Sequence, residues 1–123
     1  MLTPIAYGLA IVLVALVTFV GLRFLVVPQP AAAAYGVPAQ HDDAAAYLTI
    51  KGLRDFTFGL IGIALLAFAS AHAAGWYMLI AAIAPFGDTF VVLRHGGAKA
   101  TAFGIHFATA VCVLISAALL FAL

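Results

Sequence analysis

Four long apolar stretches, separated by short polar segments, dominate the pattern along the chain. Each stretch approaches the roughly 20 apolar residues that a helix needs to cross a bilayer. Thr3-Pro4 supplies a capping hydroxyl and a proline for a first helical turn, and Pro28 and Pro30 end the run that follows. The pattern therefore predicts membrane-spanning helices over residues 4–27, 47–71, 76–94 and 99–122.

Residues 28–46 form the one long connection between these helices. The segment is rich in proline and alanine, which leaves room for a short helix at the membrane surface. Asp42 or Asp43 can cap the second spanning helix. His41 beside them resembles a loose metal or capping site, but adjacent residues alone cannot supply tetrahedral metal geometry, so capping is favoured.

The two remaining connections are short. Residues 72–75, with the sequence HAAG, predict a tight turn between the second and third helices. Pro85 interrupts the third helix, because a proline nitrogen cannot donate and so frees a backbone carbonyl near Ala81. An ordinary, tolerated kink is an equally good reading of Pro85. The fold class that follows is all-α: an integral membrane, up-down four-helix bundle, with one transmembrane domain over residues 1–123.

Every formally charged side chain falls at one end of this bundle, which we call the charged end. In an up-down arrangement it collects Arg23, Asp42, Asp43, Lys51, Arg54, Asp55, Asp88, Arg94 and Lys99. The opposite end carries only the termini and His72. Because lysine and arginine accumulate on the cytoplasmic side of membrane proteins, we expect the charged end in the cytoplasm and both termini outside, in a bacterial inner membrane.

Composition supports a membrane environment. Hydrophobic residues make up 67% of the chain and charged residues 7%, against roughly 25% charged residues in soluble domains. A net charge of +1 and the lack of a basic patch exclude nucleic acid as a partner. The single cysteine, Cys112, excludes an internal disulfide and a paired-cysteine redox motif.

The strongest group of chemically active residues opens the second helix. Lys51, Arg54 and Asp55 lie three and four positions apart and so share a helix face. Counting along the helices places Asp88 of the third and His106 of the fourth at a similar depth. Ionisable groups inside a membrane cost roughly 2.5–3.5 kcal/mol each on insertion scales, and they persist only when paired or hydrated.

Two interpretations of this group remain open. It can be structural, with Arg54 or Lys51 paired to Asp88 to fix helix register. It can also be a functional pocket, closed and walled by phenylalanines. Under the second interpretation the catalytic candidates are Asp88, Asp55, Arg54 and His106, and the ligand-binding candidates are Lys51, Arg94, His95, Phe58, Phe86 and Phe103. Snorkelling at a helix end also accounts for Arg94 and His95. No metal and no cofactor is expected.

A family resemblance adds to this reading. The KGLRDFTFG stretch opening the second helix, together with Asp88 and the Leu93-Arg94-His95-Gly96 ending of the third, resembles the small bacterial and fungal membrane family catalogued as domain of unknown function 4267. The resemblance covers most of the chain. It implies a four-helix integral membrane protein with Lys51, Arg54, Asp55 and Asp88 as signature residues, and it implies no particular activity.

Three functions fit these observations. The first is an enzyme that binds a lipophilic small molecule and converts it by acid–base chemistry, as an isomerase or cyclase does. Asp88 or Asp55 would be the acid or base, Arg54 would hold an anionic group and His106 would relay protons. The second is a non-catalytic accessory or amphiphile-binding protein. The third, less favoured, is a small proton-coupled transporter. The expected partners are the lipid bilayer and a lipophilic or amphiphilic small molecule, with a homodimer left open.

Overall fold

A computed structural model describes residues 1–39 and 44–123, and across these residues the protein is helical with no strand. The first helix, α1 (Leu2–Val26), is followed directly by the short α2 (Pro28–Tyr35) and then by α3 (Ala45–Phe68). The third apolar stretch forms α4 (Ala71–Ala81) and α5 (Ile83–Arg94). The fourth forms α6 (Lys99–Thr101), the π-helix η2 (Ala102–Phe107) and α7 (Ala108–Phe121). The expectation of an all-α protein is confirmed.

Three helical runs are long and apolar enough to cross a membrane: Leu2–Val26, Ala71–Arg94 and Lys99–Phe121. Their outer surfaces carry many exposed large apolar side chains, as a lipid-facing surface does. α3 has 24 residues and a comparable length. It stands apart because Lys51, Arg54 and Asp55 lie in its first half.

The turn between the second and third apolar stretches lies earlier in the chain than residues 72–75. α3 ends at Phe68, and Ser70 caps α4 by accepting a hydrogen bond from the backbone N–H of Ala73 at 3.1 Å. Serine is a preferred capping residue because its hydroxyl satisfies a free N–H of the first turn. Gly75, expected in the turn, lies inside α4, where an added Cβ would be 3.0 Å from the Phe121 ring.

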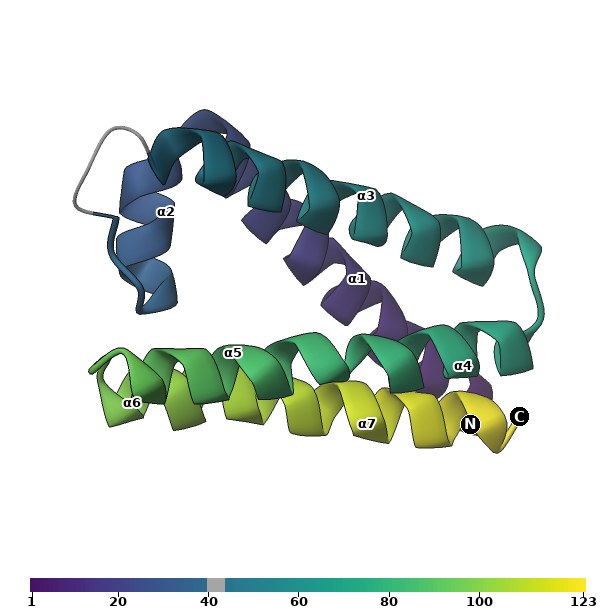
Figure 1. Ribbon diagram of the computed structural model, residues 1–123. Helices are drawn as coiled ribbons and strands as arrows, with labels where there is room; N and C mark the ends of the chain where they lie inside the picture. Colours follow the sequence, from purple (N-terminus) through teal and green to yellow (C-terminus); the bar gives the residue numbers. More distant parts are fainter. Residues whose placement is uncertain (40–43) are drawn as a thin grey trace.

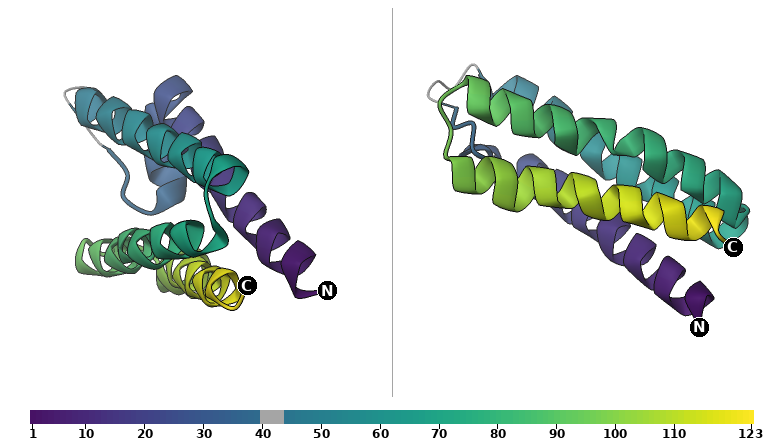
Figure 2. Two further views of the ribbon diagram at one scale, coloured as in Figure 1. Left: turned by 90° about the vertical axis from the view of Figure 1, so that its right-hand side faces the viewer. Right: turned by 90° about the horizontal axis from the view of Figure 1, so that it is seen from below.

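The helices pack as two antiparallel pairs, and the up-down four-helix bundle expected from the sequence is not confirmed. α3 runs along α1, whereas α4 and α5 run along α7 and η2 (Figure 1). α1 crosses diagonally from one pair to the other, and Figure 1 and the left view of Figure 2 show α3 set apart from the α4–α7 pair. The chain termini share one end of the molecule, and α2 and α6 lie at the other.

Glycines explain why α1 and α3 pack so closely. Gly21 and Gly52 face each other, and a Cβ added to Gly52 would lie 2.8 Å from the carbonyl oxygen of Gly21. Further along, Gly59 abuts Thr18, and a Cβ on Gly62 would lie 2.8 Å from a methyl group of Val14. Small residues allow two helix backbones to approach in this way. Gly59 and Gly62 thus serve the α1–α3 contact.

The densely packed regions lie at the two ends of the molecule. One apolar cluster joins α1, α4 and α7 near the termini, around the fully buried Ala6, Ala10 and Leu120. The other joins α1 and α2, around Phe24 and Ala32, at the opposite end. The space between α3 and the α4–α5 run is left less filled.

Two irregularities interrupt the helices beside this space. The third run breaks at Ala82, between α4 and α5, three residues before Pro85. The hydroxyl of Thr89 donates to the Pro85 carbonyl at 2.8 Å. The break agrees with the prediction that Pro85 disturbs the helix near Ala81. The second irregularity is η2, which contains His106, and π-helical turns occur frequently at functional sites.

The described charged residues lie toward the end that carries α2 and α6, as the charge pattern predicts. The connection 28–46 contains α2, which is the short helix that its composition allowed. His41, Asp42 and Asp43 fall outside the described residues. The capping and metal-site interpretations placed on them therefore remain predictions.

Candidate functional site

Tyr35, the last residue of α2, is the centre of the polar contacts. Gly36 follows it with a φ of 100°, a left-handed conformation that ends the helix and suits glycine. The Tyr35 hydroxyl donates a hydrogen bond to Oδ2 of Asp88. Its backbone carbonyl lies 2.6 Å from Nε2 of His106. Because a carbonyl can only accept, Nε2 of His106 carries the hydrogen in this contact.

Aromatic rings surround Tyr35. The Phe24 ring meets the Tyr35 ring edge-on at 5.5 Å between centroids, and the His106 ring lies 4.2 Å away. The ammonium of Lys51 stands 4.5 Å from the Phe24 centroid and 4.2 Å from the Tyr35 centroid. A cation above aromatic faces is attracted by their negative π-clouds. Four different helical segments therefore meet at one tyrosine.

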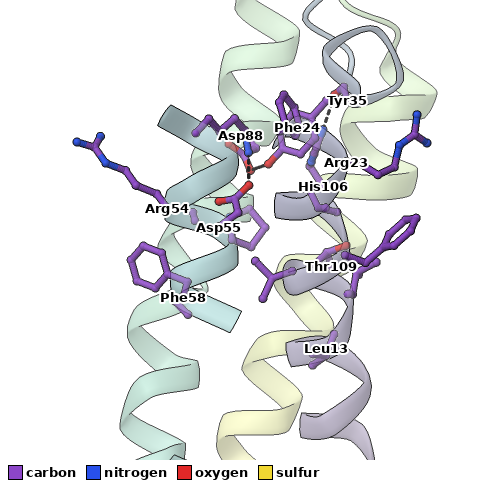
Figure 3. A pocket seen from close by; sticks show the side chains of 18 of the residues that line it. Leu13, Arg23, Phe24, Tyr35, Arg54, Asp55, Phe58, Asp88, His106 and Thr109 are labelled. Atoms are coloured by element: carbon purple, nitrogen blue, oxygen red, sulfur yellow. Dashed lines mark hydrogen bonds and ion pairs between the residues drawn. The ribbon is translucent and has the colours of Figure 1, made fainter. Parts of the chain in front are cut away.

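Lys51 pairs with Asp55, one helical turn further along α3. Its Nζ lies 2.5 Å from Oδ2 of Asp55. Within residues 1–39 and 44–123 this is the only ion pair of lysine or arginine with a carboxylate. The structural alternative paired Asp88 with Arg54 or Lys51, and that pairing is wrong for the described residues, because Asp88 is bonded to Tyr35. Arg54 is exposed and points away from Asp55 in Figure 3.

A cavity of about 670 Å³ lies against these groups, within the range of roughly 300–1,000 Å³ typical of small-molecule sites. Its walls come from α1, α2, α3, α4, α5, η2 and α7. Most of the lining is apolar, and the polar members gather near Tyr35 (Figure 3). The lining residues with polar side chains are Arg23, Tyr35, Tyr47, Lys51, Arg54, Asp55, Tyr77, Asp88, His106 and Thr109.

The cavity is open rather than closed, which corrects the expected shape. Tyr47 is 76% exposed and Phe58 is 51% exposed, and both line it. The physical reason is the separation of α3 from α5, since each packs chiefly against a different neighbour. A molecule can therefore reach the cavity from the side, through the layer that lipid would occupy.

Six of the predicted site residues line this cavity. They are Phe58, already mentioned, and Asp88, Asp55, Arg54, His106 and Lys51. Asp55 and Asp88 enter it from opposite walls, α3 and α5. His106 is 3% exposed and is therefore almost fully buried.

Four predicted site residues do not line the cavity. Phe86 and Phe103 are 37% and 49% exposed, and both rings contact Phe107 instead. Nδ1 of His95 lies 2.9 Å from the Val91 carbonyl at the end of α5, and the Arg94 guanidinium lies over the exposed Phe90 ring at 5.9 Å. These positions suit residues at a membrane interface.

Sequence reasoning did not include Tyr35 or Phe24 among the candidates. A usable signal existed for Tyr35, because it is the one aromatic residue in PQPAAAAYGVP and it precedes a glycine that can end a helix. No comparable signal marks Phe24, which lies in an apolar run among many similar residues.

The surroundings of Tyr35 keep its hydroxyl protonated, so that it remains a hydrogen-bond donor. Burial raises the pKa of the Tyr35 hydroxyl well above its usual value, and the neighbouring Asp88 carboxylate raises this pKa further. Tyr35 therefore keeps its proton at every physiological pH. Across the part of the chain that the structure describes, no three His, Cys, Asp or Glu side chains gather closely enough to hold a metal ion.

Comparison with known proteins gives one finding about the family. No curated protein and no solved structure matches the chain. The family model with the description "Domain of unknown function (DUF4267)" matches residues 5–120, which is almost the whole chain. The matched range includes every residue of the site around Tyr35. The chain therefore belongs to the family of domain of unknown function 4267.

Proposed function

We propose that the protein spans a bacterial inner membrane with four helices, with α3 as the fourth span beside the three apolar ones. α3 has a suitable length, and its apolar second half continues to Phe68. The charged end faces the cytoplasm and both termini lie outside, because all five lysines and arginines belong to the charged end. A reporter that is active only outside the cytoplasm, fused to the C-terminus, tests this orientation. An inactive reporter on a well-expressed, folded fusion contradicts it.

We further propose that the large cavity binds a lipophilic small molecule with a polar end group. One observation carries this proposal: a mostly apolar cavity of about 670 Å³ whose ionisable side chains are gathered in one region. The apolar part of such a ligand would lie along α1 and α4, beside Val14, Val17 and Met78. Its polar group would lie near Lys51 and Asp88, where hydrogen bonds offset the cost of leaving water.

The experiment is to identify small molecules that stay bound during purification. Protein purified in a mild detergent is extracted, and the extract is compared by mass spectrometry with extracts of two variants. Ala81→Trp fills the cavity wall, whereas Ile80→Trp is its control, because Ile80 is 62% exposed and does not line the cavity. We expect a lipophilic compound in the wild type and in Ile80→Trp, and its loss from Ala81→Trp. The same compounds in all three samples would contradict the proposal.

Acid–base conversion of this molecule, as in isomerisation, cyclisation or epoxide opening, is the second candidate. The observation that favours it is the different environment of the two carboxyl groups at the cavity. Asp55 pairs with an ammonium, and Asp88 accepts from a phenol. Two carboxyl groups in unlike surroundings can divide the roles of acid and base. Arg54 at the rim would hold an anionic group, and His106 would relay a proton.

Conversion is tested in cells that overproduce the protein or its variants. Asp55→Asn and Asp88→Asn keep the size of each side chain but remove its acidity. Lipophilic extracts are compared by mass spectrometry, and a compound that appears with the wild type should disappear with either variant. If binding is retained and both variants give the wild-type products, the protein is a non-catalytic amphiphile-binding or accessory protein.

A further inference from the structure

A second, smaller cavity of about 210 Å³ lies directly beyond Tyr35. Four residues border both cavities: Phe24, Tyr35, Lys51 and Asp88. The other described residues that line the small cavity are Ala32, Val37, Leu48 and Val91, none of which borders the large one. The Tyr35–Asp88 pair is thus part of a wall between two spaces.

The small cavity can hold water. One water molecule needs roughly 10–15 Å³ of space open to its centre and two to four polar partners. The volume of about 210 Å³ is sufficient for several. Residues of the wall between the two cavities supply the polar partners, which are the Lys51 ammonium, the Asp88 carboxylate and the Tyr35 hydroxyl. Among the described residues the remainder of the lining is apolar, so water would collect against these groups.

The position of this cavity in the fold indicates where its water comes from. Its described walls are the last turn of α1, α2 with Val37 after it, the first turns of α3 and the second half of α5, all toward the charged end. The large cavity extends away from the same wall toward Val14 and Val113, between the apolar helices. Asp88 therefore has one side toward the charged end and the other toward the lipophilic space.

We propose that the small cavity is a water site that supplies protons to Asp88 from the charged end, for use on the molecule in the large cavity. A hydronium ion in the small cavity gives its proton to the Asp88 carboxylate and becomes water. The resulting carboxylic acid gives the proton to a basic atom of the ligand and returns to the carboxylate. The use of the proton rests on the proposed function, whereas the water site does not.

The neighbours of Asp88 suit it to this role. Tyr35 orients the carboxylate through its hydrogen bond and keeps its own proton. The other ionisable groups that share the large cavity near it are Lys51 and Asp55 from α3 and His106 from η2. The Lys51 ammonium and the Asp55 carboxylate together carry no net charge, and Nε2 of His106 donates to the backbone carbonyl of Tyr35.

Cysteine accessibility tests for the water. The chain has one cysteine, so Cys112→Ala gives a background without thiols. Into it we place Ala32→Cys or Leu48→Cys in the small cavity, Val14→Cys in the large cavity, and Ile11→Cys as a control. Ile11 is 55% exposed on an apolar helix and lines neither cavity. Each folded variant, in liposomes, meets a small, permanently charged methanethiosulfonate and, separately, a lipophilic maleimide.

We expect the charged reagent to modify Ala32→Cys and Leu48→Cys at least about tenfold faster than Ile11→Cys, because hydrocarbon holds no water to carry it. If the charged reagent modifies neither, while the maleimide modifies both, the small cavity is dry and the proposal is overturned. Val14→Cys separates the two proposals. If the maleimide does not modify Val14→Cys, the proposal that a ligand enters the large cavity is contradicted. The water site is then decided by Ala32→Cys and Leu48→Cys alone.

Infrared spectroscopy tests the proton path itself. The carboxylic acid band that disappears in Asp88→Asn reports the Asp88 proton, and transfer into D₂O reports its exchange. We expect Leu48→Trp, which fills the small cavity, to slow this exchange, and Ile11→Trp to leave it unchanged. Slowing by Val17→Trp alone would place proton entry in the large cavity and overturn the proposal. The lack of an Asp88 acid band at every pH at which the protein stays folded would do the same.

Discussion

At the residue scale, Tyr35 organises the site because it uses its hydroxyl, its ring and its backbone carbonyl at once. The hydroxyl binds Asp88, the ring lies beside Phe24 and Lys51, and the carbonyl accepts from His106. A polar group in a half-buried position is stabilised only when each donor and acceptor has a partner. Removing one group from this residue should therefore disturb contacts on several helices.

Tyr35→Phe keeps the ring and deletes the hydroxyl. At neutral pH we expect a loss of about 1–2 kcal/mol in the free energy of unfolding, because the Asp88 carboxylate loses its donor. The measurement is denaturant unfolding in detergent micelles. Tyr47→Phe is the control, since Tyr47 is 76% exposed and forms no hydrogen bond within the described residues. A loss of equal size in both variants contradicts the role assigned to the Tyr35 hydroxyl.

Tyr35→Phe should also change how the free energy of unfolding depends on pH above pH 10. The folded pKa of Tyr35 is raised above its unfolded value of about 10. The stabilisation linked to its proton is complete below pH 10 and is lost as the pH rises above it, because the unfolded chain releases the proton first. The wild type should lose up to about 1.4 kcal/mol per pH unit more than Tyr35→Phe above pH 10. Parallel stability curves for the two proteins would contradict this.

Lys51 and Arg54 are close in sequence but differ in their contacts. Lys51→Met leaves the Asp55 carboxylate without its cation and removes the contacts with two rings, so we expect a loss of about 1–2 kcal/mol. Partial exposure of the pair, 31% for Lys51 and 22% for Asp55, keeps the loss below that of a fully buried pair. Arg54→Met should change stability by less than about 0.5 kcal/mol. Equal losses in thermal unfolding would show that the ion pair adds no stability.

At the element scale, glycine decides which helices can approach. α1 and α3 come close because Gly21 and Gly52 bring backbone against backbone. η2 and the break at Ala82 interrupt the regular α-helices beside the cavity. The position of His106 depends on η2, and the position of Asp88 depends on the helix that starts again after Ala82.

Gly52→Ala tests the close approach. An added Cβ would meet the Gly21 carbonyl oxygen and the Phe24 Cβ at 2.8 Å and the Leu25 nitrogen at 2.9 Å, so α1 would have to move. We expect a lower midpoint of thermal unfolding, with a loss of roughly 1–3 kcal/mol. Gly8→Ala is the matched control, because a Cβ there meets nothing within 4 Å. It should raise stability slightly, by up to about 1 kcal/mol, through helix propensity. A stabilising Gly52→Ala would contradict the packing described for α1 and α3.

At the scale of the whole molecule, two helix pairs are joined firmly at both ends and separated between them. The cluster around Ala10 joins the pairs at the end with the termini. At the charged end they are joined by the contacts of Tyr35 with Asp88 and His106. The cavity lies between these two ends and opens at the side, and in the proposed membrane placement this opening would face lipid. Under the proposed function, this arrangement would give a lipophilic molecule a route that does not pass through water.

A tryptophan placed in the packed end or in the hollow middle should have opposite effects. Ala10 is fully buried, so Ala10→Trp should prevent stable folding through overpacking. Val17 lines the cavity, so Val17→Trp should be tolerated and should change stability by less than about 1 kcal/mol. Thermal unfolding in detergent compares the two. Strong destabilisation by Val17→Trp would mean that the cavity is filled by side chains in solution.

The site could be predicted from the sequence only in part. Periodicity and charge placed Lys51, Asp55, Asp88 and His106 at a common depth, because helix rise is fixed and the count of residues gives the height of each. The same counting could not tell which way Phe86 and Phe103 point. The rotation of a helix about its axis depends on the neighbours against which it packs, and the local sequence pattern does not identify these neighbours.

What the sequence alone determined is the all-α class of the protein, its apolar character suited to a membrane and the end at which its charge collects. These follow from short-range rules, namely hydropathy, helix geometry and the positions of Pro85 and Lys51 in their helices. Only the tertiary structure decided that Asp88 is bonded to Tyr35 rather than to Arg54, and that the cavity between the helices is open instead of closed. The reason is physical. α2 lies in a connection with little periodicity, and it packs against α1 through contacts that the local pattern does not predict. Glycine contacts bring α3 toward α1 and away from α5.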